Sequence, residues 1–489
     1  MTEFLWTLDK MAAAMGAQRF GTPPAGITGI SIDSRTIGPG EAYFAIKGDI
    51  HDGHDFVDAA LKKGAALAVV AAGQRDKFAP DANLLVVLDV LAALGNLGIA
   101  ARHRFAGKVL AVTGSVGKTS TKEMLRSVLS AQAPTHASVA SFNNHWGVPL
   151  TLARCAQDNA FAVYEIGMNH AGEIEPLVKM VRPHVVVITT VEPVHLEFFA
   201  SVEAIADAKA EIFLGVEAGG AAVLNIDNPH FARLTSKAQA AHVARIVSFG
   251  EHATADARLL ELSLHPNCSA IHANILGHDI TYKLGMPGRH MAMNSLAVLA
   301  ASVLAGADLA HSALALSQMQ PPSGRGARLT LGFPHGRALL IDESYNANPA
   351  SMRAALNVLG QAAVGKQGRR IAVLGDMLEL GPTGPALHAA LADAIEANRV
   401  DMTFCCGPLM RNLWEALPSG RRGGYADTSA QLESQVTGAL RAGDTVMVKG
   451  SLGSKMKLIV AALERRFPPD DAGDDGEVAG RGAGFGAAE

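Results

Sequence analysis

Residues 108–120 read KVLAVTGSVGKTS, which joins a short apolar run to a glycine-rich turn and then to a helical pattern. Glycines at this point let backbone N–H groups turn toward phosphate oxygens, and the start of the following helix adds partial positive charge. The lysine supplies a full charge for the β- and γ-phosphates, and the hydroxyl after it is placed to ligate Mg²⁺. The segment therefore predicts an ATP-binding loop formed by Thr113, Gly114, Ser115, Val116, Gly117, Lys118, Thr119 and Ser120.

This loop is shorter than the common pattern G-x-x-x-x-G-K-[ST], because Val112 stands where the first glycine would fall. It follows T-G-x-x-G-K-[ST] instead. The strand–loop–helix context favours ATP binding over a chance match, but the loop alone does not identify a reaction.

The alternation of strands and helices continues on both sides of the loop. Strands are expected at residues 42–46, 84–88, 109–112, 161–165, 185–189, 221–225, 338–341, 371–374, 402–405 and 445–449. Helices are expected at residues 120–130, 174–180, 202–213 and 294–305. This alternation predicts an α/β fold with parallel sheets that are covered on both faces.

The 489 residues are too many for one ordinary core, so two or three domains are expected. A Pro-Pro-Ser-Gly stretch at 321–324 is typical of a linker. We expect domains at residues 1–106, 107–320 and 321–467. The tail 468–489 is rich in Gly, Asp, Ala and Pro and is expected to be disordered.

The composition excludes several classes of protein. Apolar residues make up 49% of the chain and charged residues 18%, with a net charge of −4 and no basic stripe that would favour a nucleic-acid partner. The longest apolar helix candidate, at 296–307, is too short to span a bilayer, so no membrane insertion is expected. The N-terminus does not resemble a signal peptide, and the four cysteines lack ligand spacing, which favours a cytoplasmic location.

Three further polar residues follow strands of the central block. Glu165 ends one strand, His195 lies just past another, and Lys209 falls within a predicted helix. Residues at the carboxyl ends of parallel strands converge on one crevice, and Glu165 could supply oxygen ligands to a hard cation there. Taken alone, each has a simpler reading: a solvated acid, a structural histidine and a helix-surface lysine.

Taken together, these segments resemble the Mur ligase family over nearly the whole chain, from Ser31 to about Lys457. The ATP loop TGSVGKTSTKE (113–123), the Asn-rich SFNNHWGVP (141–149), YEIGMNHAGE (164–173) and the histidine-to-lysine segment 195–213 carry the match in the central block. The resemblance implies a small α/β UDP-binding domain, a central P-loop-type ATPase domain with a parallel sheet, and a C-terminal Rossmann-like α/β domain.

The resemblance also implies roles for single residues in the central site. Lys118 and Thr119 would hold the ATP phosphates and one Mg²⁺, which Glu165 would ligate, and Asn144 would lie near the γ-phosphate. His195 and Lys209 would serve a second Mg²⁺, with Lys209 as a carbamate formed with CO₂; a carbamate offers Mg²⁺ an anionic oxygen, whereas an ammonium would repel it. The residues implied to face the adenine, ribose or phosphates are Asn294, Arg325 and Glu343.

Within the family, three segments resemble the members that join D-alanyl-D-alanine to UDP-N-acetylmuramoyl-tripeptide through an acyl phosphate. These segments are SYNANPASM (344–352), GDMLELG (375–381) and KGS (449–451). The substrate-binding residues implied are Ser34, Arg35 and Lys47 for the uridine and diphosphate, and Tyr345, Asn346, Asn348 and Lys449 in the third block. A monomer is expected.

Three positions depart from the family patterns. Met291 replaces the first asparagine of G-x-H-N-x-x-N, Glu343 replaces the second aspartate of D-D-S-Y-N-A-N, and Leu452 replaces the arginine of K-G-S-R. These changes remove one adenine-side hydrogen bond, lengthen one acidic side chain and remove one positive charge.

Alternative functions come from three other groups of proteins. Another amide ligase, either the diaminopimelate-adding member or a folylpolyglutamate synthetase, would keep the ATP loop, but the D-N-P-R motif of the former is absent. A P-loop regulatory ATPase would have no need of Glu165, His195 and Lys209 together. A scaffold with a decayed site is disfavoured by the intact Gly-Lys-Thr.

Overall fold

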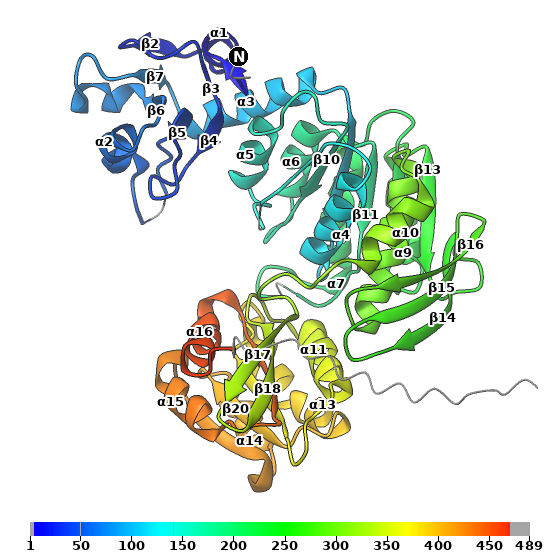
Figure 1. Cartoon of the computed structure of the whole chain (residues 1–489). Helices are drawn as coiled ribbons and strands as arrows, with labels where there is room; N and C mark the ends of the chain where they lie inside the picture. The colour runs from blue at the N-terminus through cyan, green and yellow to red at the C-terminus, as the bar shows by residue number, and fades with distance from the viewer. Residues whose placement is uncertain (1–3, 49, 140, 195, 470–489) are drawn as a thin grey trace, which may run out of the picture.

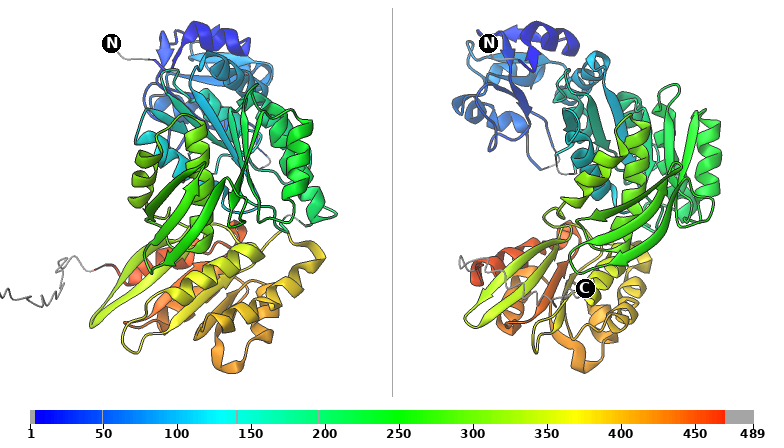
Figure 2. Two further views of the ribbon diagram at one scale, coloured as in Figure 1. Left: turned by 90° about the vertical axis from the view of Figure 1, so that its right-hand side faces the viewer. Right: turned by 45° about the vertical axis from the view of Figure 1, so that its right-hand side comes forward.

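The computed structural model describes residues 4–48, 50–139, 141–194 and 196–469, and it confirms the α/β class with three domains (Figure 1). Each domain is built on its own main sheet, and hydrophobic clusters lie on both faces of each of these sheets. The three parts follow one another along the chain, so that the central part lies between the other two (Figure 2).

The first domain contains a five-stranded sheet of order β2-β7-β6-β5-β4, in which the strands from β4 to β7 are parallel. A two-stranded ribbon of β1 and β3 lies beside it. The strands are β1 (Trp6–Thr7), β2 (Gln18–Phe20), β3 (Gly26–Ile27), β4 (Gly29–Ser31), β5 (Glu41–Phe44), β6 (Leu67–Ala71) and β7 (Leu84–Val87). The helices are α1 (Leu8–Met15), α2 (Val57–Lys62) and α3 (Val90–Arg104).

The central domain is a nine-stranded sheet of order β16-β15-β14-β13-β12-β11-β8-β10-β9. The strands from β9 to β14 pair in parallel, and β14, β15 and β16 pair antiparallel. The strands are β8 (Lys108–Thr113), β9 (Thr135–Ala137), β10 (Phe161–Glu165), β11 (Val185–Ile188), β12 (Ala221–Asn225), β13 (Arg245–Gly250), β14 (Ala257–Leu264), β15 (Ser269–Ile275) and β16 (His278–Leu284). The helices are α4 (Lys118–Ser130), α5 (Gly147–Ala153), α6 (Ile174–Val181), α7 (Val202–Ala210), α8 (Phe231–Ala240), α9 (Arg289–Leu304) and α10 (Leu309–Ser317).

The central domain differs from the sequence expectation at several places: β9, β13, α5, α8 and α10 were not expected, and α9 begins at Arg289 rather than at residue 294. The antiparallel strands β14–β16 are not among the strands expected from the sequence; they bury one face against α9 and extend the parallel sheet. The helix expected at 120–130 begins at Lys118, because Gly117 has a left-handed φ of 84° and ends the turn one residue before it. The first turn of the helix therefore contains the loop residues themselves.

The third domain contains a six-stranded sheet of order β17-β18-β22-β19-β20-β21. Only β17 is antiparallel to its neighbour, so the sheet is Rossmann-like in its parallel core. The strands are β17 (Ala327–Phe333), β18 (Gly336–Glu343), β19 (Arg370–Gly375), β20 (Met402–Cys406), β21 (Arg422–Ala426) and β22 (Thr445–Lys449). The helices are α11 (Pro349–Gln361), α12 (Gly384–Ala389), α13 (Leu391–Ala397), α14 (Met410–Ala416), α15 (Ser429–Ala439) and α16 (Lys457–Arg466).

The first domain is fixed to the central domain through the packing of α3 against α5. Leu150 and Ala153 of α5 belong to the same hydrophobic cluster as the core of the first domain. The buried guanidinium of Arg102 on α3 donates to the backbone oxygens of Val181 and Arg182, both at 2.8 Å. The two domains thus share a dry, hydrogen-bonded boundary, which keeps the first domain at a set orientation to the ATP loop.

Arg102→Leu is expected to lower the free energy of unfolding by about 2–4 kcal/mol, because it leaves the buried carbonyls of Val181 and Arg182 without their donor and removes one of the two arginines paired with Glu217. Arg233→Leu is the matched control: it removes an equally well-formed pair with Asp207 on the surface and should cost about 1 kcal/mol or less. Chemical denaturation of both variants measures the difference. Equal losses would contradict the account of this boundary.

Candidate active site

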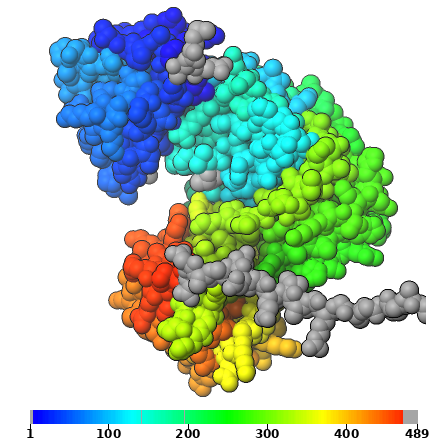
Figure 3. Space-filling model, in the orientation of Figure 1, coloured from blue at the N-terminus to red at the C-terminus, as the bar shows by residue number. Residues whose placement is uncertain are grey.

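A cavity of about 670 Å³ lies between the central and third domains. The space-filling view shows the surface hollowed between the first and third domains along this side of the molecule (Figure 3). Most of the residues predicted from the sequence line the cavity: Ser115, Val116, Gly117, Lys118, Thr119, Ser120, Glu165, Asn294, Arg325, Glu343, Tyr345, Asn346, Asn348 and Lys449. Segments far apart in the chain therefore meet at one site.

The ATP loop lies at the carboxyl end of β8, between its neighbours β11 and β10. The chain passes to opposite sides of β8 at this point, and ligand crevices of parallel sheets open at such switch points. No side chain caps the start of α4, which leaves the N–H groups of its first turn directed toward the loop. A Cβ on Gly117 would lie 2.6 Å from Nδ2 of Asn294, so only glycine fits where the loop meets α9. This is the geometry of an anion-binding helix start.

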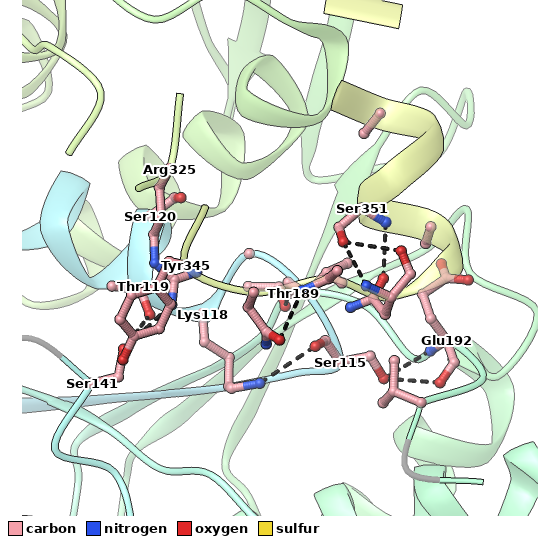
Figure 4. A pocket seen from close by; sticks show the side chains of 18 of the residues that line it. Ser115, Lys118, Thr119, Ser120, Ser141, Thr189, Glu192, Arg325, Tyr345 and Ser351 are labelled. Carbon is pink, nitrogen blue, oxygen red and sulfur yellow. Dashed lines mark hydrogen bonds between the residues drawn. The ribbon is translucent and has the colours of Figure 1, made fainter. Parts of the chain in front are cut away.

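Lys118 lies over the loop with its ammonium turned toward the loop carbonyls (Figure 4). Its Nζ donates to the backbone oxygens of Gly114 at 2.7 Å and Ser115 at 3.4 Å. Burial lowers the pKa of Lys118, the carboxylate of Glu165 opposes this, and the charge of Arg325 lowers the pKa further. An anion bound to the loop would restore favourable charge around this ammonium.

Glu165 is buried, 1% exposed, at the end of β10. Its Oε2 accepts from the hydroxyl of Thr119 at 2.8 Å, and its Oε1 accepts from the amide of Asn143 at 2.7 Å. The hydroxyl of Thr119 also lies 3.2 Å from that of Ser141. Carboxylate and hydroxyl oxygens thus lie together beside the phosphate loop, which is the donor set that a hard divalent cation prefers.

Lys209 is buried within the central domain, with 2% of its surface exposed, on α7. Burial lowers its pKa well below the ordinary value, and the nearby charge of Lys118 lowers it further. Burial therefore favours the neutral form of this amine, which is its nucleophilic form. Lys209 lies behind the cavity and is not one of its lining residues.

The third-domain wall of the cavity begins at the buried carboxylate of Asp342. This carboxylate accepts from the backbone N–H groups of Gly324 at 2.8 Å and Ser344 at 3.1 Å, and so it joins the linker to the end of β18. Within the linker, the guanidinium of Arg325 lies over the ring of Tyr345 at 4.4 Å. The same guanidinium donates to Ser141 of the central domain at 3.3 Å. Arg325 therefore bridges the two domains at the mouth of the ATP loop.

Lys449 at the end of β22 is the second lysine of the cavity. Its Nζ donates to Oε2 of Glu343 at 3.2 Å and to the backbone oxygen of Asn346 at 2.9 Å. Asn348 begins α11 with a capping box that includes Ser351. These contacts hold residues 343–351 in one fixed surface, which faces the phosphate loop.

Residues 378–380 continue this wall, and the backbone oxygen of Glu379 accepts from the N–H of Glu197 in the central domain at 3.5 Å. The ring of His388 is fully buried: its Nε2 accepts from the N–H of Met377 at 2.9 Å, and its Nδ1 lies 2.6 Å from the backbone oxygen of Gly384. The hydroxyl of Ser451 accepts from the N–H of Leu378 at 3.0 Å. Met377 and Leu378 are thereby held by hydrogen bonds to His388 and to Ser451.

Several predicted residues lie elsewhere. Thr113 and Gly114, the first two residues of the predicted loop, do not line the cavity. Neither does Asn144, whose side-chain oxygen accepts from the N–H of Gly147 at 3.0 Å. Ser34, Arg35 and Lys47 lie in the first domain, away from the lining residues; Arg35 and Lys47 are exposed. His195 lies outside the described residues.

Asn143 is the main residue that the sequence analysis missed. It is adjacent to Asn144 in the FNNH stretch, and only the structure shows that Asn143 contacts Glu165. Thr189 is a second one: its hydroxyl donates to the backbone oxygen of Val116 at 2.5 Å. A hydroxyl at the end of β11, next to β8, was the available signal for it.

The described residues contain neither a metal-binding cluster of acidic, histidine or cysteine side chains nor a membrane-spanning helix. Within 4–48, 50–139, 141–194 and 196–469, no group of three or more His, Cys, Asp or Glu side chains could hold a metal ion by itself. In the same ranges, no helix is long and apolar enough to cross a membrane.

Family models match most of the chain. The Mur ligase family, catalytic domain, matches residues 26–104; the Mur ligase middle domain matches 112–302; and the Mur ligase, glutamate ligase domain, matches 331–452. The matches follow the order of the three sheets.

Relatives and solved structures agree with these matches. The UDP-N-acetylmuramoyl-tripeptide–D-alanyl-D-alanine ligase of Escherichia coli is 33% identical over 89% of this chain and 93% of its own, and that of Bacillus subtilis is 32% identical over the same shares. A crystal structure of MurF from Acinetobacter baumannii has a TM-score of 0.81 at 31% identity, covering 94% of this chain and 99% of that one. MurF from Thermotoga maritima in complex with ADP has the same fold, with a TM-score of 0.72 at 24% identity over 90% of this chain and 97% of that one. Since the similarity extends through all three domains at this level of identity, the chain belongs to the Mur ligase family.

Proposed function

We propose that this chain joins D-alanyl-D-alanine to UDP-N-acetylmuramoyl-tripeptide, the reaction for which its bacterial relatives are named. Like the family, it is an ATP-dependent ligase that forms ADP. The observation that carries the proposal is a cavity shared by two domains, in which the ATP loop faces residues 343–351 and 378–380 of the third domain. A nucleotide and an amine acceptor can meet there.

The reaction would proceed in two steps. The terminal carboxylate of the tripeptide attacks the γ-phosphoryl group of ATP, which gives an acyl phosphate and ADP. The amine of D-alanyl-D-alanine then attacks the acyl carbon, and phosphate leaves with the oxygen that bridged carbon and phosphorus. Lys118 and the first turn of α4 would offset the charge on the transferred phosphoryl group.

The residues present fit one Mg²⁺ beside the phosphates. The described partners of the Glu165 carboxylate are neutral donors, the Thr119 hydroxyl and the Asn143 amide, so a bound cation would be the natural charge partner. When bound, Mg²⁺ would neutralise phosphate charge during transfer. Because Mg²⁺ commonly completes its shell with phosphates and water, a site with one carboxylate agrees with the lack of a larger cluster in the described part of the chain.

A second Mg²⁺ would be served by His195 and by Lys209 as a carbamate. The neutral amine that burial favours at Lys209 can attack CO₂ and release a proton, which leaves an anionic carbamate on the side chain. In the described residues no acidic side chain forms an ion pair with Lys209, and the charge that acts on it is that of Lys118.

The remaining substrate contacts are assigned by domain. We place the uridine diphosphate end at Ser34, Arg35 and Lys47 of the first domain, and the reacting ends near Tyr345, Asn346, Asn348 and Lys449, which line the cavity. The proposed boundaries remain near residues 106 and 320, and the monomer remains a prediction. A cytoplasmic location is proposed because both ATP and a UDP-linked substrate are needed and the four cysteines are free thiols.

Purified protein with Mg²⁺ and ATP is expected to release phosphate only when both the UDP-muramoyl-tripeptide and D-alanyl-D-alanine are present. The product should be heavier than the tripeptide by one dipeptide less water, measured by mass spectrometry. Phosphate release that is indifferent to the dipeptide would favour a regulatory ATPase. Release with a different amino acceptor alone would keep the family and change the member.

Lys209→Met is expected to lower the ligation rate by at least about 100-fold while raising the melting temperature, measured without CO₂ or Mg²⁺, by roughly 2–6 °C. The variant removes a buried amine whose charged form is unstable in the fold. Because the pKa of Lys209 is lower in the folded than in the unfolded chain, the unfolded wild type binds more protons between those values, and its stability rises with pH there. The advantage of the variant should therefore narrow as pH rises toward the ordinary lysine pKa.

Lys179→Met is the control, since Lys179 lies on the surface with its side chain 58% exposed and paired with Glu175. It should change neither activity nor melting temperature appreciably. Carbon-13 NMR of wild-type protein in labelled bicarbonate should show a carbamate carbon that Lys209→Met lacks. A wild-type spectrum without that signal, or a Lys209→Met variant with full activity, would contradict the carbamate.

A further inference from the structure

Lys122 is a fully buried lysine on α4 that the proposed chemistry does not use. It follows Thr119 by three residues, so the two side chains share one face of the helix. Its Nζ donates to the backbone oxygen of Ser138 at 2.8 Å and to Oε1 of Glu123 at 2.5 Å. Burying a charged group costs free energy unless an opposite charge and hydrogen bonds compensate it. Here the carboxylate of Glu123 and the backbone oxygen of Ser138 provide that compensation.

Ser138 is the base of the segment that surrounds Glu165. It is buried directly after β9, its N–H donates to Val163 on β10 at 3.3 Å, and its hydroxyl accepts from the N–H of Glu165 at 3.4 Å. Beyond it, the chain returns over the site through Ser141 and Asn143, which contact Thr119 and Glu165. The position of Ser138 therefore governs both the strand end that holds Glu165 and the loop that covers it.

The helix that presents the Thr119 hydroxyl to Glu165 thus also holds Ser138 through Lys122. Glu123 offsets the charge: burial raises its pKa, but hydrogen bonds from Lys122 and Arg126 outweigh this and leave the pKa of Glu123 lowered. Glu123 accepts from Lys122 and from Arg126 and acts as their counter-ion. The Lys122–Ser138 bond is therefore the direct tie between α4 and the base of the loop.

We propose that Lys122 is a positioning residue that sets the spacing of Thr119, Glu165 and Asn143 and thereby the affinity of the site for a divalent cation. This inference rests on the proposed Mg²⁺ site. In this proposal Lys122 acts through Ser138 and is not itself a ligand of the nucleotide or the metal. Removing Lys122 should loosen the arrangement of the Thr119 and Glu165 oxygens. The phosphate loop itself, residues 113–118, should stay in place.

The test is calorimetric binding of ADP with excess Mg²⁺ and of ADP in EDTA to the full-length protein. Lys122→Met should weaken Mg²⁺-dependent ADP binding by at least about 10-fold, the range found when a residue that orients metal ligands is lost. Binding in EDTA should change by less than about 2-fold. Glu123→Gln, which keeps the Lys122–Ser138 bond, should retain most of the Mg²⁺ effect.

Ser138→Ala provides a second variant if Lys122→Met does not fold, because it removes the hydroxyl bonded to Glu165 N–H and keeps the backbone oxygen; it should reduce the Mg²⁺ effect in the same direction. Equal losses with and without Mg²⁺ would mean direct phosphate binding by Lys122 and would overturn the inference. A lower melting temperature with an unchanged Mg²⁺ effect would also overturn it, since the role would then be stability alone. A wild-type protein whose ADP binding ignores Mg²⁺ would refute the proposed metal site itself.

Discussion

Beside the ATP loop, the buried hydroxyl of Thr119 donates to the buried carboxylate of Glu165 at 2.8 Å. This hydrogen bond joins the first turn of α4 to the end of β10, and the loop that contains Ser141 and Asn143 folds over both groups. The hydrogen-bond donors described for this buried carboxylate are neutral, and the ammonium of Lys118 also interacts with its charge, so a bound cation would add to the charge compensation. The cavity therefore suits the phosphates of a nucleotide together with a cation. Its two walls bring the groups that would bind them close to one another.

The third domain completes this arrangement from the opposite side. Asp342 ties the linker to β18, and Arg325 reaches back from that linker to Ser141. Lys449 brings a second ammonium to the wall and is neutralised by Glu343. Since the two walls belong to separate sheets joined by a glycine-containing linker, a change in their separation would alter the reacting distance without disturbing either core. The first domain is different, because α3 and α5 pack it firmly on the central domain.

Much of this could be predicted from the sequence, for identifiable physical reasons. The glycines and Lys118 mark the loop because few other residues serve a close approach to phosphate, and the apolar runs around them predict the parallel strands. The choice between Asn143 and Asn144 could not be predicted, since adjacent asparagines differ only in the direction that the folded loop gives them. Lys122 was invisible for a similar reason: a lysine one turn into a helix normally faces water, and only the packing of β9 against α4 encloses it. Lys209 has the same property, and only the family resemblance predicted a role for it.

The central claim is that the cavity activates a carboxylate by phosphoryl transfer from ATP. The most direct test uses UDP-muramoyl-tripeptide with oxygen-18 in the terminal carboxylate, together with ATP, Mg²⁺ and D-alanyl-D-alanine, and measures the mass of the phosphate released. The account predicts one oxygen-18 atom in each phosphate, because the oxygen that bridged carbon and phosphorus leaves with the phosphoryl group. Unlabelled phosphate would mean that water attacks ATP, and it would contradict the account.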